Sequence, residues 1–257
     1  MSDLYHSGVN PLDYETFLNQ KHQNLRQTLS SFAIPDTEVF VSEPSHYRLR
    51  AEFRIWHSGD RCFYAMFDPA DRKKPLEVLD FPVASVLINQ LMKRVLDKIH
   101  ESDLLKHRLF QVEFLTTLSG DALITLIYHK KLDEEWEAAA RSLMAELGYP
   151  IIGRSRKQKL VLERDWVNET LTVDGQLYHY RQIEGGFTQP NGAINEKMLS
   201  WARDCSTGIG GDLLELYCGN GNFSVALANR FERVLATEIS KTSVAAAQVN
   251  IQSNQLS

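Results

Sequence analysis

Apolar residues recur with the period of an α-helix in several stretches of the chain. The first stretch follows Asn10 and Pro11, a capping residue and a proline suited to a first helical turn, and it continues until Pro35. We therefore predict an amphipathic helix over about residues 11–33. Further helices are predicted at 87–99, at 133–147, at 191–205, from a glycine turn near 220 to about 231, and from 240 onward.

Single alternation of apolar and polar residues marks the predicted strands. Between Tyr47 and Trp56 every second residue is apolar or small and most of the others are charged, which indicates a strand with one buried face. Arg48, Arg50 and Arg54 share its outer face. Further β-rich runs lie at 62–67, 110–118, 122–129, 151–162, 171–183, 213–217 and 234–237, with turns at 119–121 and 174–175.

The arrangement of these elements changes near residue 182. Before it, hairpins connect successive strands, which is typical of an α+β fold rich in antiparallel strands. After it, strands and helices alternate as in a Rossmann-like α/β domain, but the sequence holds only two strands of such a sheet. We predict an α+β region over residues 1–182 and an incomplete α/β domain over residues 183–257. Nothing in the sequence prevents the helix at 11–33 from packing on the second domain.

Composition places the chain among ordinary globular proteins. It has 257 residues, of which 43% are hydrophobic and 24% are charged, and no apolar run is long enough to span a membrane. The first ten residues lack the pattern of a secretory signal, so we expect a cytoplasmic protein. A net charge of −5 argues against indiscriminate coating of nucleic acid, because such binding needs cations to neutralise phosphates. The three cysteines are far apart, so we expect no disulfide and no metal site.

A two-glycine turn after an apolar strand carries the strongest chemical signal. Gly219 and Gly221 follow the strand at 213–217, and glycine lets the backbone approach a ligand closely. Glu238 ends the next strand, where a carboxylate accepts hydrogen bonds from ribose hydroxyls. The turn therefore indicates an adenosine cofactor. Ser224 stands where a dinucleotide site requires glycine or alanine, and together with Glu215 it favours S-adenosylmethionine over NAD. An NAD-dependent oxidoreductase remains the alternative.

Six longer segments form a more specific set. From about Ser45 onward the chain resembles the bacterial tRNA (uracil-5-)-methyltransferases, and the pairing of residues 187–191 with residues 215–221 is specific to RNA uracil-5-methyltransferases. The segments are 45–57 (Ser-His-Tyr-Arg-Leu-Arg-Ala-Glu-Phe-Arg-Ile-Trp-His), 115–119 (Leu-Thr-Thr-Leu-Ser), 128–133 (Tyr-His-Lys-Lys-Leu-Asp), 187–191 (Phe-Thr-Gln-Pro-Asn), 214–223 (Leu-Glu-Leu-Tyr-Cys-Gly-Asn-Gly-Asn-Phe) and 234–239 (Val-Leu-Ala-Thr-Glu-Ile).

This resemblance implies an enzyme that transfers methyl groups from S-adenosylmethionine to RNA. The acceptor is the uridine at position 54 in the T loop of tRNA, and transfer-messenger RNA is a plausible second substrate. The resemblance also implies a monomeric full-length enzyme and an RNA-recognition role for the α+β region. Related ribosomal-RNA methyltransferases carry an extra β-barrel and a four-cysteine iron–sulfur site, and neither pattern occurs in this sequence.

Individual site residues follow from the same resemblance. The residues implied to contact the cofactor are Gln189, Tyr217, Asn222 and Glu238, and those implied to contact RNA are Arg54, Phe110 and His129. Lys130 and Lys131 adjoin His129, and the basic segment 154–159 is a second candidate for phosphate contacts. Cys218 lies in the cofactor turn and is not expected to be the catalytic nucleophile.

The family's catalytic motifs are missing from these 257 residues. In this chemistry a cysteine thiolate adds to C6 of uracil, C5 accepts the methyl group, and a base removes the C5 proton. The family keeps the cysteine in Ser-Cys-Asn-Pro, an aspartate in Asp-Pro-Pro-Arg and a glutamate base near its C-terminus, and the two motifs do not occur here. We therefore expect no catalytic residue in this chain. We expect a C-terminally truncated methyltransferase that is inactive and exposes apolar surface. The alternative is a non-catalytic RNA-binding fragment.

Overall fold

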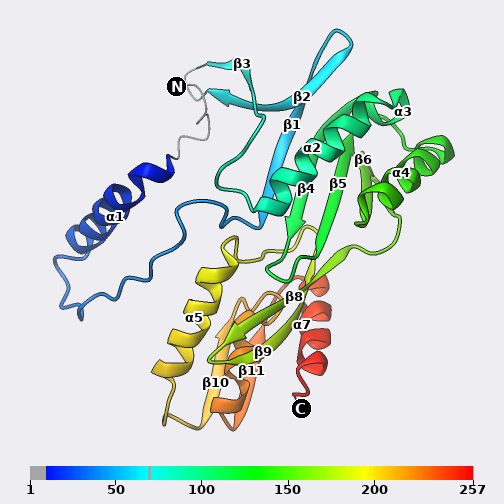
Figure 1. Cartoon of the computed structure of the whole chain (residues 1–257). Coiled ribbons are helices and arrows are strands. Elements are labelled where there is room, and N and C mark those ends of the chain that lie inside the picture. Colours follow the sequence, from blue (N-terminus) through cyan, green and yellow to red (C-terminus); the bar gives the residue numbers. More distant parts are fainter. Residues whose placement is uncertain (1–9, 69–70, 257) are drawn as a thin grey trace.

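A seven-stranded sheet forms the N-terminal half of the protein. The computed structural model describes residues 10–68 and 71–256, and Figure 1 shows this sheet above a smaller C-terminal unit. The strand order is β3-β2-β1-β4-β5-β6-β7, and all neighbours are antiparallel except β5 and β6. The strands are β1 (Arg50–Ser58), β2 (Arg61–Asp68), β3 (Asp71–Glu77), β4 (Leu109–Thr116), β5 (Ala122–Tyr128), β6 (Ile151–Ser155) and β7 (Gln158–Val161).

Helices pack on one face of this sheet and build the main core. They are α2 (Val86–His100), α3 (Asp103–Lys106) and α4 (Glu134–Leu147), and α4 makes the crossover between the parallel strands β5 and β6. Alternation along β1 follows the prediction, because Ala51, Phe53 and Ile55 are buried while Arg54 and Trp56 are exposed. The core therefore lies between α2 and α4 on one side and the inner sheet face on the other.

The C-terminal unit has the predicted β-α-β-α order. It comprises α5 (Gly192–Cys205), β10 (Asp212–Leu216), α6 (Asn222–Leu227), the 3-10 turn η2 (Ala228–Arg230), β11 (Arg233–Thr237) and α7 (Lys241–Ser253). Strands β10 and β11 pair in parallel, as a Rossmann-like unit requires. The described chain thus combines a mixed sheet with an α/β unit.

A hairpin of β8 (Trp166–Val173) and β9 (Gln176–Ile183) links these two parts. Asp174 and Gly175 form its tight turn with positive φ angles, as predicted for this pair. Its buried side chains share a core cluster with α5 and α6, and α7 packs along β9. The hairpin ends at Ile183, and the domain boundary placed after residue 182 remains a prediction.

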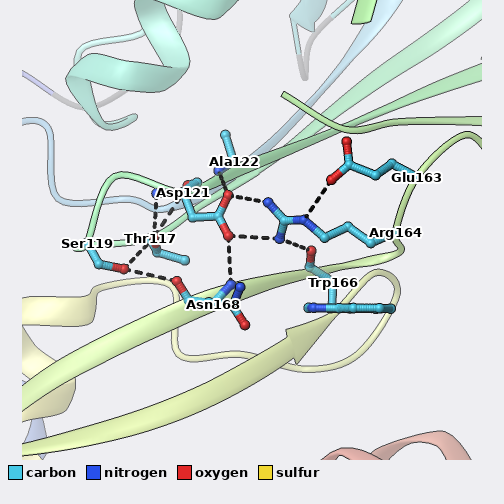
Figure 2. Close-up of polar contacts among 8 residues, drawn as sticks. All are labelled: Thr117, Ser119, Asp121, Ala122, Glu163, Arg164, Trp166 and Asn168. Carbon is cyan, nitrogen blue, oxygen red and sulfur yellow. Dashed lines mark hydrogen bonds and ion pairs between the residues drawn. The ribbon is translucent and has the colours of Figure 1, made fainter. Parts of the chain in front are cut away.

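Polar contacts attach this hairpin to the β4–β5 turn. Figure 2 shows the carboxylate of Asp121 facing Arg164, whose Nη1 and Nη2 donate to it at 2.8 and 2.7 Å. The amide of Asn168 donates to the same carboxylate, and the Ser119 hydroxyl donates to the Asn168 carbonyl oxygen. Burial alone would raise the pKa of Asp121, but the hydrogen bonds from Arg164 and the backbone lower it below its usual value. The link therefore stays ionised near neutral pH.

The N-terminal helix is shorter than predicted. A 3-10 turn η1 (Pro11–Asp13), capped by Asn10, leads into α1 (Tyr14–Thr28), which ends before the predicted residue 33. Thr28, Ser30 and Ser31 favour helices weakly, which accounts for the earlier end. No residue of α1 is buried, and its hydrogen bonds run to the segment 37–42. That segment in turn contacts α5 through Trp201 and Lys197.

Candidate nucleic-acid interface and cofactor turn

Three planar side chains, from β1, from β4 and from the residue after β5, stack on the open face of the seven-stranded sheet. The Cζ atom of Arg54 lies 3.7 Å from the ring centroid of Phe110, and the ring centroid of His129 lies 4.0 Å from the same point at an interplanar angle of 28°. Two groups this close to one ring cannot share a face, so Phe110 is sandwiched between them. The structure thus brings together the three residues that the resemblance implies for RNA contact.

Local backbone geometry explains why Phe110 takes part. Strands β4 and β5 pair with an irregularity between Leu109 and Gln111, so Phe110 is the extra residue of a β-bulge. A phenylalanine in a strand more often belongs to the core, yet this ring is only half-buried. Arg54 pairs with Gln111 across β1 and β4, and His129 follows the end of β5, so all three strands deliver side chains to one point.

A groove of about 850 Å³ continues from this stack toward β6 and β7. Phe110 and His129 form one wall, and Lys130, Lys131 and Arg156 contribute the cations of its lining. Lys131 and Arg156 are exposed, while partial burial lowers the pKa of Lys130. The groove therefore combines aromatic rings with positive charge, which suits bases and phosphates.

The other two arginines of the predicted strand, Arg48 and Arg50, do not join the stack. Arg48 donates through Nε to the carbonyl oxygen of Arg50, and Arg50 donates to the carbonyl oxygen of Gly186. The basic segment 154–159 is divided as well, because Arg154 and Lys159 both form ion pairs with Glu184. Only part of each predicted basic patch is therefore free to meet an anion.

The glycine turn lies where the sequence pattern predicts it, directly after β10. Gly219 and Gly221 have φ angles of +58° and +82°, which other residues adopt at a cost. The carboxylate of Glu238 accepts hydrogen bonds from the amides of Ser240 at 2.7 Å and Gly219 at 3.0 Å. Those bonds, from Ser240 first, lower the pKa of Glu238. Glu238 is thus ionised and fixed against the turn.

The other predicted cofactor residues lie in different environments. Tyr217 immediately precedes it with a φ of +59° and is 86% exposed, so its ring is free to meet a ligand. The side-chain amide of Asn222 exchanges two hydrogen bonds with that of Asn195 on α5, at 2.8 and 2.9 Å. Gln189 is half-buried and lies three residues before α5.

Ser224 and Cys218 occupy buried positions beside the turn. The Ser224 hydroxyl donates to the carboxylate of Glu215, whose pKa is raised by burial. Burial also raises the pKa of the Cys218 thiol, and the carboxylates of Glu215 and Glu238 raise it further. A protonated, buried thiol is a poor nucleophile, which agrees with the prediction that Cys218 is not catalytic.

Two asparagines that the sequence patterns do not reveal hold the turn in place. Asn250 on α7 is fully buried, accepts from the amide of Arg181 at 2.6 Å and donates to the carbonyl oxygen of Asn220 at 2.8 Å. Asn195 on α5 fixes Asn222 through the paired side-chain amides. Each contact joins residues far apart in sequence, so local spacing carries no signal for it.

Neither a metal-binding cluster nor a membrane-spanning helix is found in the described ranges 10–68 and 71–256. No group of three or more His, Cys, Asp or Glu side chains there is arranged to hold a metal ion. No helix in that part of the chain is both long and apolar enough to cross a bilayer.

Comparison with known proteins identifies the family. A sequence model of the tRNA (Uracil-5-)-methyltransferase family matches residues 13–257. The chain belongs to this family. A tRNA/tmRNA (uracil-C(5))-methyltransferase of Aromatoleum aromaticum is 56% identical to it over 249 residues, which cover 97% of this chain and 68% of that protein. A protein of the same description from Dechloromonas aromatica is 55% identical and is matched over 96% of this chain and 68% of its own length.

A solved structure supports the fold. The tRNA (uracil-54, C5)-methyltransferase of Pyrococcus abyssi, in complex with S-adenosyl-L-homocysteine, superimposes with a TM-score of 0.68 at 16% identity. The match covers 95% of this chain and 61% of that protein, so the two share a fold over the described elements. The chain spans about two thirds of the length of its curated relatives. The family resemblance predicted from the sequence motifs is therefore confirmed.

Proposed function

We propose that this chain serves the methylation of uridine C5 at position 54 in the T loop of tRNA, with S-adenosylmethionine as the methyl donor. Transfer-messenger RNA is the second substrate, and the reaction takes place in the cytoplasm on a monomeric full-length enzyme. Family membership and the tRNA/tmRNA substrates named for its relatives support this proposal.

The convergence of Arg54, Phe110 and His129 is the observation that carries the proposal. A loop uridine must leave its stack before its C5 can be reached, so the enzyme has to stabilise unstacked bases. Aromatic rings and an arginine plane provide such surfaces, and the adjoining cations attract the phosphates. In the free protein both faces of Phe110 are covered, so a base stacks on the exposed His129 or displaces one partner.

The turn at Gly219 fits an adenosine cofactor. A Cβ at Gly219 would meet no atom within 4 Å, so there is open space in front of the backbone. Each carboxylate oxygen of Glu238 accepts one backbone hydrogen bond and retains a lone pair for a ribose hydroxyl. When bound, S-adenosylmethionine supplies a methyl group on a sulfonium. Asn222 would act through its backbone or after release from Asn195.

The buried Ser224 hydroxyl argues against the NAD alternative. A dinucleotide site needs a glycine or an alanine here so that the helix can pack closely on the strand without a polar group between them. Ser224 instead donates to Glu215, a polar contact between α6 and β10. We therefore place S-adenosylmethionine ahead of NAD as the ligand of this turn.

Binding of RNA is tested with a hairpin that has the sequence of a tRNA T arm. We expect Arg54→Ala to raise the dissociation constant roughly tenfold and to reduce the salt dependence of binding by about one counterion. Arg94→Ala removes the same charge from α2, on the covered face of the sheet, and should leave both quantities unchanged. Equal affinities for the three proteins would contradict the assignment of this face to RNA.

Methyl transfer is a separate question for these 257 residues. Because they contain no Ser-Cys-Asn-Pro motif and Cys218 is a poor nucleophile, we propose that they bind RNA without methylating it. Titration with S-adenosylhomocysteine and with NADH distinguishes the two cofactors, and incubation of S-adenosylmethionine carrying a radioactive methyl group with T-arm RNA tests turnover. Labelled RNA from this chain alone would refute the proposed inactivity.

A further inference from the structure

Trp56 lies on the same open sheet face as the RNA stack and has no place in the function proposed so far. It follows Arg54 by two residues on β1, so both side chains point away from the core at a separation of about 7 Å along the strand. Trp56 is 38% exposed, whereas Trp136 on the covered side of the sheet is fully buried. The largest aromatic side chain of β1, that of Trp56, therefore faces outward beside Arg54.

Neighbouring strands extend this aromatic surface. Phe63 of β2 pairs directly with Trp56, and Phe67 packs edge-on against it with ring centroids 6.0 Å apart. An open face of an antiparallel sheet normally carries polar side chains. β8 covers only the part of this face that carries Leu115, Leu123 and Ile152, through Val167. The aromatic surface around Trp56 lies outside that covered part and is open to solvent.

We propose that Trp56 is an additional base-stacking residue, which receives an unpaired base of the RNA next to the one held at Arg54, Phe110 and His129. The inference rests on the proposed function. Trp56 lies one side-chain repeat from Arg54 along β1. The cations of the groove that Phe110 and His129 line hold the backbone of the same RNA. The carboxylates on this face, Glu52 and Glu113, lie beyond Arg54 in the opposite direction along β1.

Stacking and charge leave different signatures, and this difference defines the experiment. T-arm RNA is titrated into the 257-residue protein while its affinity and tryptophan fluorescence are measured. We expect Trp56→Leu to raise the dissociation constant roughly five- to 150-fold, the range typical of one lost base–aromatic stack, and to leave the salt dependence unchanged. Arg54→Ala should reduce the salt dependence instead. Trp56→Phe should retain most of the affinity and lose the RNA-induced fluorescence quenching.

The control is Trp201→Leu, which removes a 45% exposed tryptophan from α5, and thermal melting verifies that each variant is folded. Trp56→Leu binding as tightly as the unaltered protein, while Arg54→Ala binds weakly, would overturn the role of Trp56 and leave the proposed function intact. Absence of binding by the unaltered protein would overturn both. If Trp56→Phe and Trp56→Leu lower the affinity for RNA equally, Trp56 packs against its neighbours and does not stack on a base.

Discussion

The three thiols of the chain lie in different environments and should react at different rates. Cys205 is exposed on α5, whereas burial raises the pKa of both Cys62 and Cys218. Because the thiolate is the reactive form, we expect a thiol reagent to modify Cys205 rapidly and the other two only on unfolding. Mass spectrometry of partially alkylated protein measures this order. Rapid labelling of Cys218 would show that the turn is more open than described and would reopen its role as a nucleophile.

Single residues were predictable where the backbone pattern dictates their place. Glu238 follows from the spacing between a glycine turn and the end of the next strand, and the structure places its carboxylate against the turn, where it accepts a hydrogen bond from the Gly219 amide. The contact between Asn195 and Asn222 was not predictable, because it depends on how α5 packs against α6. The alternating pattern also did not predict that Arg54 joins the stack while Arg50 does not, because Arg50 donates to a carbonyl group 136 residues away. The cofactor and RNA roles themselves remain predictions.

At the scale of elements, β1 and β3 show what periodicity can detect. Strict alternation over Tyr47 to Trp56 predicted β1 correctly, because one face is buried by α2. Strand β3 has the sequence Asp-Arg-Lys-Lys-Pro-Leu-Glu and gave no strand signal. It is an edge strand, and charged residues and proline protect such edges from pairing with other chains. The charged residues and the proline that removed the strand signal from this sequence are therefore the residues that suit an edge strand.

The contact between β8 and the β4–β5 turn should make stability depend on pH. The buried carboxylate of Glu169 accepts hydrogen bonds from the amides of Leu118, Ser119 and Thr170. Burial nevertheless raises its pKa from 4.5 to about 7. Between these values the folded protein holds a proton that the unfolded chain releases, so stability falls as the pH rises, by up to about 3 kcal/mol.

Replacement of this carboxyl by a neutral amide isolates its contribution. We expect the stability advantage of the unaltered protein over Glu169→Gln to be largest below a pH of 4.5, the usual pKa of the group, and to shrink as the pH rises past its folded pKa of about 7. Urea unfolding at a series of pH values measures this difference. Glu135→Gln, at an exposed site on α4, is the control and should show no such trend. Parallel pH profiles for Glu169→Gln and the unaltered protein would disprove the assignment.

Close packing of β6 against α4 depends on a glycine. A Cβ at Gly153 would lie 2.2 Å from Cη2 of the fully buried Trp136, so Gly153→Ala forces the indole ring out of place. We expect a loss of about 1–3 kcal/mol in the free energy of unfolding, as for other overpacked cores. In a Trp136→Phe background the same substitution should cost less, because the clashing part of the ring is absent. Additive costs in a urea-unfolding cycle would exclude this clash as the cause.

At the scale of the whole molecule, the parallel pair β10–β11 leaves apolar side chains in solvent. Leu214, Leu216 and Leu235 share one face of the pair and are 58%, 58% and 65% exposed, which confirms the expectation of exposed apolar surface. Parallel sheets are normally covered on both faces, so this surface favours contact with another apolar surface. We therefore expect the 257-residue protein to associate as its concentration rises, against the weak repulsion of a net charge of −5.

Charged substitutions on that face should abolish the association without unfolding the protein. Leu214→Lys combined with Leu235→Lys places two charges on the apolar face, and sedimentation velocity should then show monomers at concentrations where the unaltered protein forms larger species. Leu79→Lys, at a site that is 79% exposed and outside the C-terminal unit, is the matched control and should still associate. If both variants associate like the unaltered protein, another surface mediates the contact. If the unaltered protein stays monomeric throughout, burial of apolar area at β10–β11 is too small to offset the entropy lost on association.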